Sequence, residues 1–288
     1  MSQPRKVDSK EVGLVIGMIL GKYFLNTEDL HYGYWTPGLP VSGANMAQAQ
    51  ANYSKFLISH IPAGTKTILD VGCGTGHLAR KLLGLGYRVD CVSPSPLLTE
   101  RARQKLGDAC QIFECTYEEV ETEKPYDLVL FSESWQYVKM EPSFRKTQTL
   151  LPEGGHLLIC DFFKTDAKGK SALGGGHRLS KFYRLISSYP FAAVQDLDIT
   201  RETAPNLALV DEVLTRAGIP IRDLVSYFLN QNYPRLSKFL QWQFQKKIEK
   251  LNFKYFSGQR NAENFAKFKS YRLLLYQKVG SGQRSVGG

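Results

Sequence analysis

One segment of the chain has the residue types that bring a protein backbone close to a ligand: Asp70-Val-Gly-Cys-Gly-Thr-Gly76. It follows an apolar run at 67–71 and precedes leucines at helical spacing over 78–85, so it connects a strand to a helix. Glycines at such a connection let the main chain approach a bound molecule, and the start of the helix offers free N–H groups. The G-x-G-x-G spacing, with an acidic residue two positions before the first glycine, predicts a nucleotide-type binding loop rather than a ligand-free turn.

The elements that position this loop alternate between strand and helix. Apolar runs predict five strands, at 67–71, 87–92, 111–115, 126–131 and 156–163. Helix-length segments separate these strands. Because parallel neighbours need long connections, the pattern predicts a parallel sheet with right-handed crossovers. Two more strands are expected at 191–199 and 271–278, and helices at 10–24, 44–60, 78–85, 96–106, 178–188 and through 205–269.

The stretch from Ile68 to Gly76 (ILDVGCGTG) resembles the first motif of the class I S-adenosylmethionine (SAM)-dependent methyltransferases. The resemblance covers residues 30–278 and implies an α/β, Rossmann-like fold. Its seven-stranded, mostly parallel sheet is expected to have the order 3-2-1-4-5-7-6. The resemblance also implies SAM as the cofactor, S-adenosylhomocysteine as the product and no metal. An NAD enzyme would keep a wider glycine spacing and an acidic residue after the second strand, which argues against hydride transfer.

This resemblance implies a set of cofactor contacts. In the family, the loop after the first strand passes along the methionine half of the cofactor, and the next strand ends reach its ribose and adenine. The second strand commonly ends in an acid that binds both ribose hydroxyls. This chain has Ser93 there, whose hydroxyl can also bond a ribose. Tyr117 is expected to stack on the adenine. The implied contacts are Tyr32, Asp70, Gly72, Cys73, Gly74, Ser93, Pro94, Thr116, Tyr117 and Ser132.

Methyl transfer from a sulfonium is a direct in-line displacement, so such an enzyme mainly aligns the reacting atoms and excludes water. A general base is needed only where the acceptor must lose a proton that water does not easily remove. The candidates for that role are Glu133, Tyr137 and His177, and the alternative for each is a capping or helix-start residue. Gln136 is expected to face the substrate. Gln136 and Tyr137 stand where related cyclopropane synthases would have Glu and His, so plain methylation is preferred over cyclopropanation.

An aromatic segment near the N-terminus, His31-Tyr-Gly-Tyr-Trp35, resembles that of one small-molecule branch of the family. This branch includes tocopherol and alkaloid methyltransferases and the cyclopropane-fatty-acid and mycolic-acid synthases. In it an N-terminal helical cap, here residues 1–60, closes over the cofactor. An aromatic face attracts a cation, so Tyr32 is expected beside the sulfonium, with Tyr34 and Trp35 beside the substrate. The alternative is that these rings only pack the N-terminal region onto the core.

The formal net charge of +10 is concentrated in one region. Between positions 222 and 272, eleven Lys or Arg residues stand against three acidic residues, with twelve aromatic residues among them. By its position between the sixth and seventh strands, 201–270 resembles a helical substrate lid inserted into a methyltransferase core of 61–200 and 271–279. An aromatic lid suits a bulky or lipophilic substrate, with Phe239 and Trp242 as contacts. The basic exterior either is solvated or contacts an anionic membrane surface or an acidic substrate.

Composition bears on the size of the core, the redox state of the cysteines and the expected cellular location. With 43% hydrophobic residues, the chain can bury a sizeable core. The five cysteines form no C-x-x-C pair and no metal-ligand spacing, which indicates reduced thiols in the cytoplasm. The longest apolar stretch, 12–20, is too short for a membrane span and lacks a signal-peptide cleavage site. We expect a cytoplasmic monomer or homodimer with a disordered tail at 280–288.

Three functions remain open. The leading one is a SAM-dependent methyltransferase that acts on O, N or C of a hydrophobic small molecule, such as a natural product or a lipid-like metabolite. The second is RNA methylation, which the basic charge with interleaved aromatics favours. Ser132-Glu-Ser-Trp135 stands where such enzymes would have an Asn-Pro-Pro-Tyr type motif, so nucleic acid is not the expected partner. The third is a catalytically inert SAM-fold binding protein, because Ser93 and Tyr137 replace commoner residues.

Overall fold

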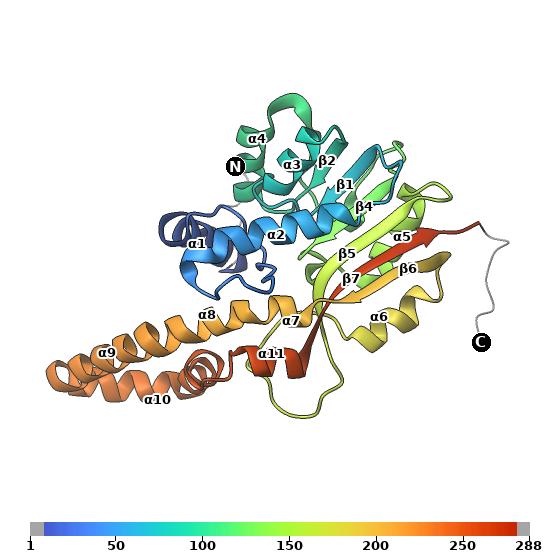
Figure 1. Ribbon diagram of the computed structural model, residues 1–288. Coiled ribbons are helices and arrows are strands. Elements are labelled where there is room, and N and C mark those ends of the chain that lie inside the picture. The colour runs from blue at the N-terminus through green and yellow to red at the C-terminus, as the bar shows by residue number, and fades with distance from the viewer. Residues whose placement is uncertain (1–8, 281–288) are drawn as a thin grey trace, which may run out of the picture.

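The computed structural model describes residues 9–280, whose strands form one seven-stranded sheet of order β3-β2-β1-β4-β5-β7-β6 (Figure 1). The first five strands pair in parallel, and β7 is antiparallel to both β5 and β6. The fold and strand order predicted from the sequence are therefore confirmed. The strands are β1 (Thr67–Val71), β2 (Arg88–Val92), β3 (Ile112–Phe113), β4 (Leu128–Ser132), β5 (His156–Lys164), β6 (Phe191–Asp198) and β7 (Lys269–Lys278).

Helices cover both faces of the sheet (Figure 1). On one face α2, α3, α4, α8 and α11 contribute to a first hydrophobic core, and on the other α5 and α6 contribute to a second. The helices are α1 (Ser9–Leu25), α2 (Met46–Ser59), α3 (His77–Gly84), α4 (Pro96–Leu106), α5 (Met140–Leu150), α6 (Leu179–Ile186), α7 (Thr200–Thr203), α8 (Pro205–Val213), α9 (Ile219–Asn232), α10 (Pro234–Leu251) and α11 (Ala262–Phe268).

The central strands explain why the sheet is easy to recognise in the sequence. Successive side chains of a strand point to opposite faces, so Ile68 of β1 enters the first core and its neighbour Leu69 enters the second. Because both faces are covered, β1 and β4 are mostly apolar, and the acidic exception within β1 is the buried Asp70. The edge strand β3 is shorter than the expected 111–115, since it pairs only with Cys91 and Val92 of β2. Glu114 then turns outward and forms an ion pair with Arg103 at 2.9 Å.

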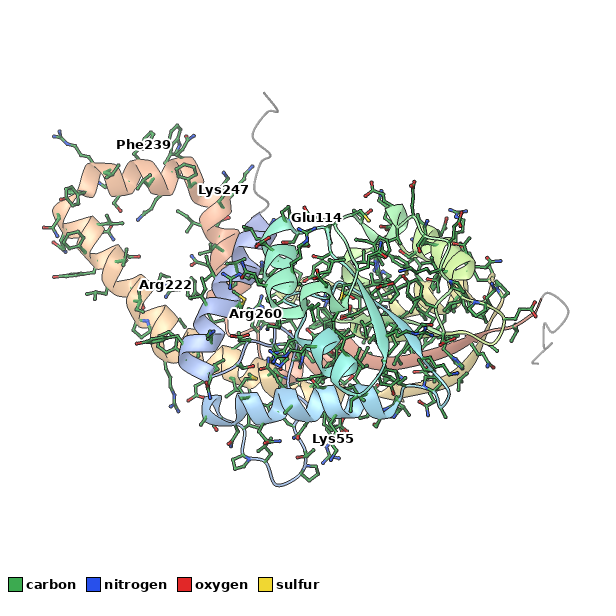
Figure 2. All side chains as sticks on the ribbon, turned by 90° about the horizontal axis from the view of Figure 1, so that it is seen from above. Lys55, Glu114, Arg222, Phe239, Lys247 and Arg260 are labelled. Carbon is green, nitrogen blue, oxygen red and sulfur yellow. The ribbon has the colours of Figure 1, made fainter. Side chains whose placement is uncertain are left out.

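The helical region between β6 and β7 divides into two parts. Its ends, α8 and α11, pack on the first core through Leu207 and Phe265. Between them α9 and α10 extend away from the sheet and return through a bend at Phe244, which has non-helical backbone angles (Figures 1 and 2). We call residues 219–251 the arm. Two π-helical turns, Leu214–Gly218 and Asn252–Phe256, connect the arm to α8 and toward α11.

Two further sequence expectations concern the ends of the chain and the membrane. The tail expected to be disordered lies outside the described residues from position 281 onward. Over residues 9–280, no helix combines the length and apolar composition needed to cross a bilayer.

Candidate active site

The glycine-rich loop after β1 has the backbone conformation that its glycines allow. Gly72, Gly74 and Gly76 have φ angles of 78°, 57° and 76°, in the left-handed region that favours glycine. A Cβ on Gly72 would lie 2.4 Å from the Cβ of Ser134, so no side chain fits between this loop and the segment after β4. Cys73 is largely buried in the first core, and its main-chain N–H and carbonyl are already bonded to the Val92 carbonyl and the Gly76 N–H.

Asp70 is a buried acid at the base of this loop. Its side chain is 2% exposed, and its Oδ2 has no hydrogen-bond partner within the described residues. Burial raises the pKa of this carboxyl group to about 7. An unpartnered buried carboxyl group destabilises a protein unless a ligand or a proton compensates it. Asp70 is therefore suited to hold a positively charged group, such as an amine, against the loop.

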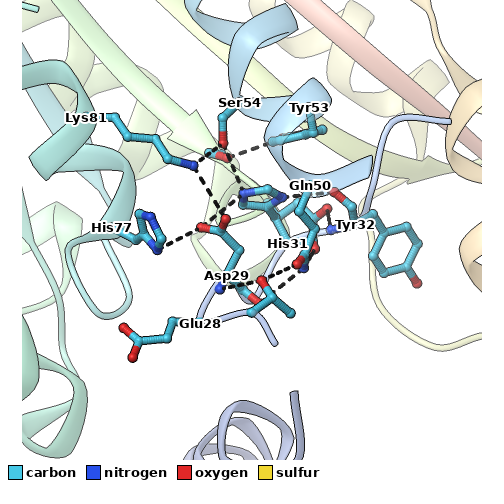
Figure 3. Close-up of polar contacts among 12 residues, drawn as sticks. Glu28, Asp29, His31, Tyr32, Gln50, Tyr53, Ser54, His77 and Lys81 are labelled. Atoms are coloured by element: carbon cyan, nitrogen blue, oxygen red, sulfur yellow. Dashed lines mark hydrogen bonds and ion pairs between the residues drawn. The ribbon is translucent and has the colours of Figure 1, made fainter. Parts of the chain in front are cut away.

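The segment that precedes Tyr32 covers the loop and is held by charged groups (Figure 3). Leu30 lies over Gly74, since a Cβ added there would be 3.8 Å from the Leu30 Cδ1. Asp29 lies 3.4 Å from the imidazole nitrogens of His31 and His77 and from the Lys81 Nζ. Burial raises the pKa of Asp29, but the hydrogen bond and charge of His31, with the charges of Lys81 and His77, outweigh it and hold that pKa well below its usual range.

Glu28 forms further ion pairs, one of which connects this segment to a helix beside the loop. Its carboxylate lies 2.6 Å from the Lys22 Nζ and 2.9 Å from the Lys105 Nζ. Hydrogen bonds from these two lysines lower the pKa of Glu28 to about 2. The residues around Glu28 and Asp29 therefore fasten the N-terminal segment to α3 and α4.

Glu133 connects the covering segment to the end of β4. It has a φ of 53°, and its Oε1 accepts hydrogen bonds from the Tyr32 N–H at 2.6 Å and the Tyr271 hydroxyl at 2.7 Å. Burial raises the pKa of Glu133, although the His31 charge and these hydrogen bonds act in the opposite direction. The Tyr32 ring lies about 6 Å from the rings of Phe162 and Tyr271. Glu133 thus lies at the border between the glycine-rich loop and a group of aromatic rings.

Three charged residues that sequence reasoning missed surround these rings. Asp161 of β5 is fully buried, and its carboxylate accepts hydrogen bonds from the N–H groups of Gln136 and Phe162. Burial, and next the charge of Glu133, raise the pKa of Asp161. Lys269 is also buried, donates to the carbonyl groups of Gly174 and Gly175, and has its pKa lowered by burial to about 8.

Arg260 is the third missed residue and lies near the base of the arm (Figure 2). Its Nε is buried and has no hydrogen-bond partner within the described residues. Burial raises the pKa of the Tyr32 phenol, and the charge of Arg260 opposes that shift. Arg260 therefore brings a positive charge within electrostatic reach of Tyr32. Asp161 and Lys269 could be suspected only as charged residues inside apolar runs, and Arg260 carried no signal in the sequence.

The residues expected at the ribose and adenine differ in where their side chains point. Ser93 is buried and accepts a hydrogen bond from the Ser95 N–H at 3.4 Å, while Pro94 is exposed. Thr116 is bound to the carboxylate of Glu119 in a helix-capping arrangement. Tyr117 points into the second core, where it contacts Phe131 and bonds the Thr147 hydroxyl at 2.8 Å. The stacking expected of Tyr117 is therefore corrected, because the short helix Tyr117–Glu119 turns its ring inward.

The candidates after β4 and β5 lie in different environments. Ser132 lies 3.2 Å from the Tyr53 hydroxyl, and Gln136 binds Asp161 through its main chain. Tyr137 is 61% exposed. The His177 Nε2 lies 2.9 Å from the Val138 carbonyl oxygen, and burial lowers the pKa of this imidazole. His177 thus ties the glycine-containing loop after β5 to the segment after β4.

The residues expected at the substrate are not brought together. Tyr34 stacks on Phe56 of α2 with 4.8 Å between ring centroids, and Trp35 is buried, with its main-chain N–H bonded to the Glu202 carbonyl. Both therefore anchor the N-terminal segment onto α2 and α7. Phe239 and Trp242 lie on the arm, largely exposed and in contact with each other.

The sheet order, the glycine-rich loop and the buried acid together define the class I methyltransferase fold. Residues 46–260 match the model of a methyltransferase domain family, and the chain belongs to that family. The resemblance seen in the sequence is thus confirmed. Over the described residues, no group of His, Cys, Asp and Glu side chains is arranged to hold a metal ion.

Curated relatives share part of this chain. A malonyl-[acyl-carrier protein] O-methyltransferase of Anoxybacillus flavithermus is 30% identical over 174 residues, which are 58% of this chain and 61% of that protein. An uncharacterized methyltransferase of Mycobacterium tuberculosis is 28% identical over 97 residues, 34% of this chain and 40% of that protein. The chain therefore matches about three fifths or less of the length of these relatives.

Solved structures share the architecture of almost the whole chain. Geranyl diphosphate C-methyltransferase from Streptomyces coelicolor A3(2) is 15% identical with a TM-score of 0.64, covering 96% of this chain and 100% of that one. The [4+2]-cyclase SpnF is 14% identical with a TM-score of 0.65, covering 95% of this chain and 98% of that one. Since a methyltransferase and a cyclase are equally similar at such low identity, these likenesses show the fold alone.

Proposed function

We propose that this protein is a SAM-dependent methyltransferase that acts on a small organic acceptor. The observation that carries the proposal is the buried, unpartnered Oδ2 of Asp70 beneath a loop of left-handed glycines. These residues fit the amino-acid half of SAM: Asp70 would hold its ammonium group, and the left-handed turns at Gly72 and Gly74 would bring the main chain close to it. When bound, SAM supplies a methyl group on a positively charged sulfur atom.

The other residues of the site support an alignment role. Glu133 holds the main chain of Tyr32, and the charged ties at Glu28 and Asp29 keep the covering segment closed. A closed segment excludes water from the reacting atoms. Both hydrogen bonds to Glu133 use Oε1, which leaves Oε2 for an acceptor proton, so Glu133 is the favoured base where the acceptor needs one.

The acceptor that these surroundings suit has an apolar body and a polar group. Tyr32, Phe162, Phe265 and Tyr271 form the aromatic part of the site, and Arg260 contributes an unpartnered buried Nε. A guanidinium group favours a carboxylate or phosphate on the acceptor. The acceptor atom is O, N or C. Malonyl-[acyl-carrier protein] and geranyl diphosphate, after which similar proteins are named, are the first acceptors to test.

Calorimetric titration with SAM tests the cofactor site. The wild type is expected to bind SAM with a micromolar Kd, and Asp70→Asn to bind at least about tenfold more weakly, because a charged hydrogen bond is lost. Asp108→Asn is the matched control, since Asp108 is an exposed aspartate outside the loop. Failure of the wild type to bind SAM contradicts the proposal.

Transfer of a radiolabelled methyl group from SAM tests the reaction itself. We expect label to appear in a small organic acceptor, and Glu133→Gln to lower kcat while leaving the Kd for SAM nearly unchanged. SAM binding without transfer to any acceptor fraction would instead support the inert binding protein. The domain boundaries, the cytoplasmic location and the monomeric or dimeric state stay predictions.

A further inference from the structure

The arm exposes apolar side chains that no other described part of the chain covers. In α9, Ile221, Leu224, Val225 and Phe228 follow the i, i+3, i+4, i+7 spacing of one helix face, yet each is 52 to 68% exposed. A helix face with this spacing normally packs against a core. None of the residues of α9 is buried.

The second helix of the arm repeats this pattern. Before the bend, Leu236 and Phe239 share one face and are 48 and 54% exposed, and Trp242 is 73% exposed. At the bend, Phe244 is 39% exposed, and Ile248 beyond it is 38% exposed. In α10 only Ser237 is buried. Exposed apolar surface of this extent on a soluble chain marks an interaction site.

The charge of the arm is complementary to an anionic partner. It carries six basic residues against Asp223 and Glu249, so its formal net charge is +4. Asp223 is already paired with Arg222 at 2.7 Å. The remaining basic residues, which alternate with the exposed apolar ones along α10, are Arg235, Lys238, Lys246, Lys247 and Lys250.

We propose that the arm binds the surface of an anionic lipid bilayer. Helices that carry aromatic and aliphatic residues together with Lys and Arg lie in the interface, with rings at the headgroup level and cations at the phosphates. Pairing of two arms from two copies would instead bring together two groups of net charge +4, which repel each other. The apolar residues of α10 lie on both sides of its bend at Phe244. A fluid lipid surface can contact both groups at once.

A second element of the molecule supports the same contact. In α1, Ile16, Ile19 and Tyr23 follow helical spacing and are 51 to 82% exposed. This helix lies on the same side of the molecule as the arm in both views (Figures 1 and 2). The proposal goes beyond methyl transfer, because it concerns where the protein works and does not depend on which acceptor it modifies.

Tryptophan fluorescence tests the proposal with a probe already present in the chain. Of the three tryptophans, Trp35 and Trp135 are buried, so Trp242 is the one that can enter a membrane. We expect vesicles of phosphatidylcholine and phosphatidylserine that contain brominated lipid to quench and blue-shift the emission. Pure phosphatidylcholine vesicles should have little effect. The quenching should vanish in Trp242→Phe while flotation with the anionic vesicles persists.

Charge reversal on the arm separates this contact from general attraction of a basic protein. The triple variant Lys246→Glu, Lys247→Glu and Lys250→Glu is expected to reduce vesicle partitioning at least about tenfold. The control triple variant Lys55→Glu, Lys168→Glu and Lys170→Glu has the same net charge but lies outside the arm, and should retain most binding. Unchanged SAM binding and melting temperature would show that both variants are folded.

Three results would overturn the proposal. The first is the absence of quenching and flotation with anionic vesicles. The second is equal loss of vesicle binding in both triple variants. The third is a concentration-dependent dimer, abolished by the arm variant, in a protein that does not float with vesicles. These outcomes are independent of SAM binding, so they are distinguishable from a failure of the proposed function.

Discussion

The loop end of the sheet and the arm differ in how far their side chains are buried. Around Asp70, glycines, a buried acid and a covering segment occupy positions that packing and hydrogen bonds define. On the arm, residues equally able to bind a ligand are exposed and make few contacts. Aromatic residues are thus buried in the core in one region and exposed on the surface in the other.

The tryptophans Trp135 and Trp242 illustrate this difference. Trp135 is 1% exposed and contacts the rings of Phe131, Phe144 and Phe182. Trp242 is 73% exposed and has the ring of Phe239 about 6 Å away. We therefore expect Trp135 to stabilise the core, whereas the exposed Trp242 is available for binding.

The largest effect on stability is expected from Trp135→Ala. Removal of a buried aromatic side chain loses its transfer free energy and leaves a cavity, which costs about 3–5 kcal/mol. Urea denaturation, with SAM binding as the check of the native fold, measures this change. A loss of less than about 1 kcal/mol would show that the second core is loosely packed, and the contrast between the two regions would fail.

Gly72→Ala is expected to destabilise the protein by about 3 kcal/mol. The alanine would have to adopt a left-handed conformation, and its Cβ would lie 2.4 Å from the Ser134 Cβ. Gly64→Ala is the matched control, because Gly64 has a φ of 85° but a Cβ there would meet no other atom within 4 Å. It should cost about 1 kcal/mol in the same urea experiment. Equal losses would show that the contact with Ser134 does not constrain the loop.

The stability contribution of Asp70 should decrease as pH rises. Burial raises its pKa from an ordinary value near 4 to about 7, so the native state keeps a proton that the unfolded chain has lost. The stability due to this group is complete below pH 4 and is lost as pH rises through 7. Relative to Asp70→Asn, the wild type should therefore lose about 2–3 kcal/mol between about pH 5 and pH 8.

This pH dependence is measured by urea denaturation of the SAM-free protein at several pH values. Asp108→Asn is again the matched control, because it removes the carboxylate of an exposed aspartate outside the loop. A pH-independent difference for Asp70→Asn would mean that Asp70 already has a partner in the native protein.

The smallest effect is expected from Trp242→Ala. Because this side chain is 73% exposed, its truncation should change the free energy of unfolding by less than about 0.5 kcal/mol. Thermal and urea denaturation check this expectation beside Trp135→Ala. A loss of more than about 2 kcal/mol would show that the arm is packed in solution and would remove the distinction between the two regions.

Most of the fold was predictable, because the local hydrophobic periodicity of the sequence matches the strands and helices of the observed fold. Each expected strand except β3 begins and ends within two residues of the observed strand. The same holds for each expected helix outside 205–269. The sequence also predicts the glycine-rich loop between strand and helix, and the structure adds the left-handed φ angles of its glycines. The pattern at 205–269 predicts helices, and the structure confirms them. Its periodicity could not reveal the division into packed ends and an extended arm, because an amphipathic pattern does not say what covers its apolar face.

The site was only partly predictable. Asp70 and Glu133 stand in segments that a strand end exposes to a ligand, and both were expected. The position of Tyr117 after the third strand predicts a contact with the adenine, but a short helix turns its ring into the core. Asp161 and Lys269 belong to strands with many apolar residues, so the sequence marks them only as charged residues there and not as members of this site.

The sequence by itself determined the sheet, the glycine-rich loop and the acid beneath it, because strand periodicity and glycine conformations are local properties. Only the tertiary structure decided which side chains meet. The bonds of Glu133 to Tyr32 and Tyr271 join residues that lie 101 and 138 positions apart. The exposure of the arm likewise depends on packing, because no other described part of the chain covers its apolar faces. Contacts between distant segments depend on how the elements pack, and no local pattern encodes that packing.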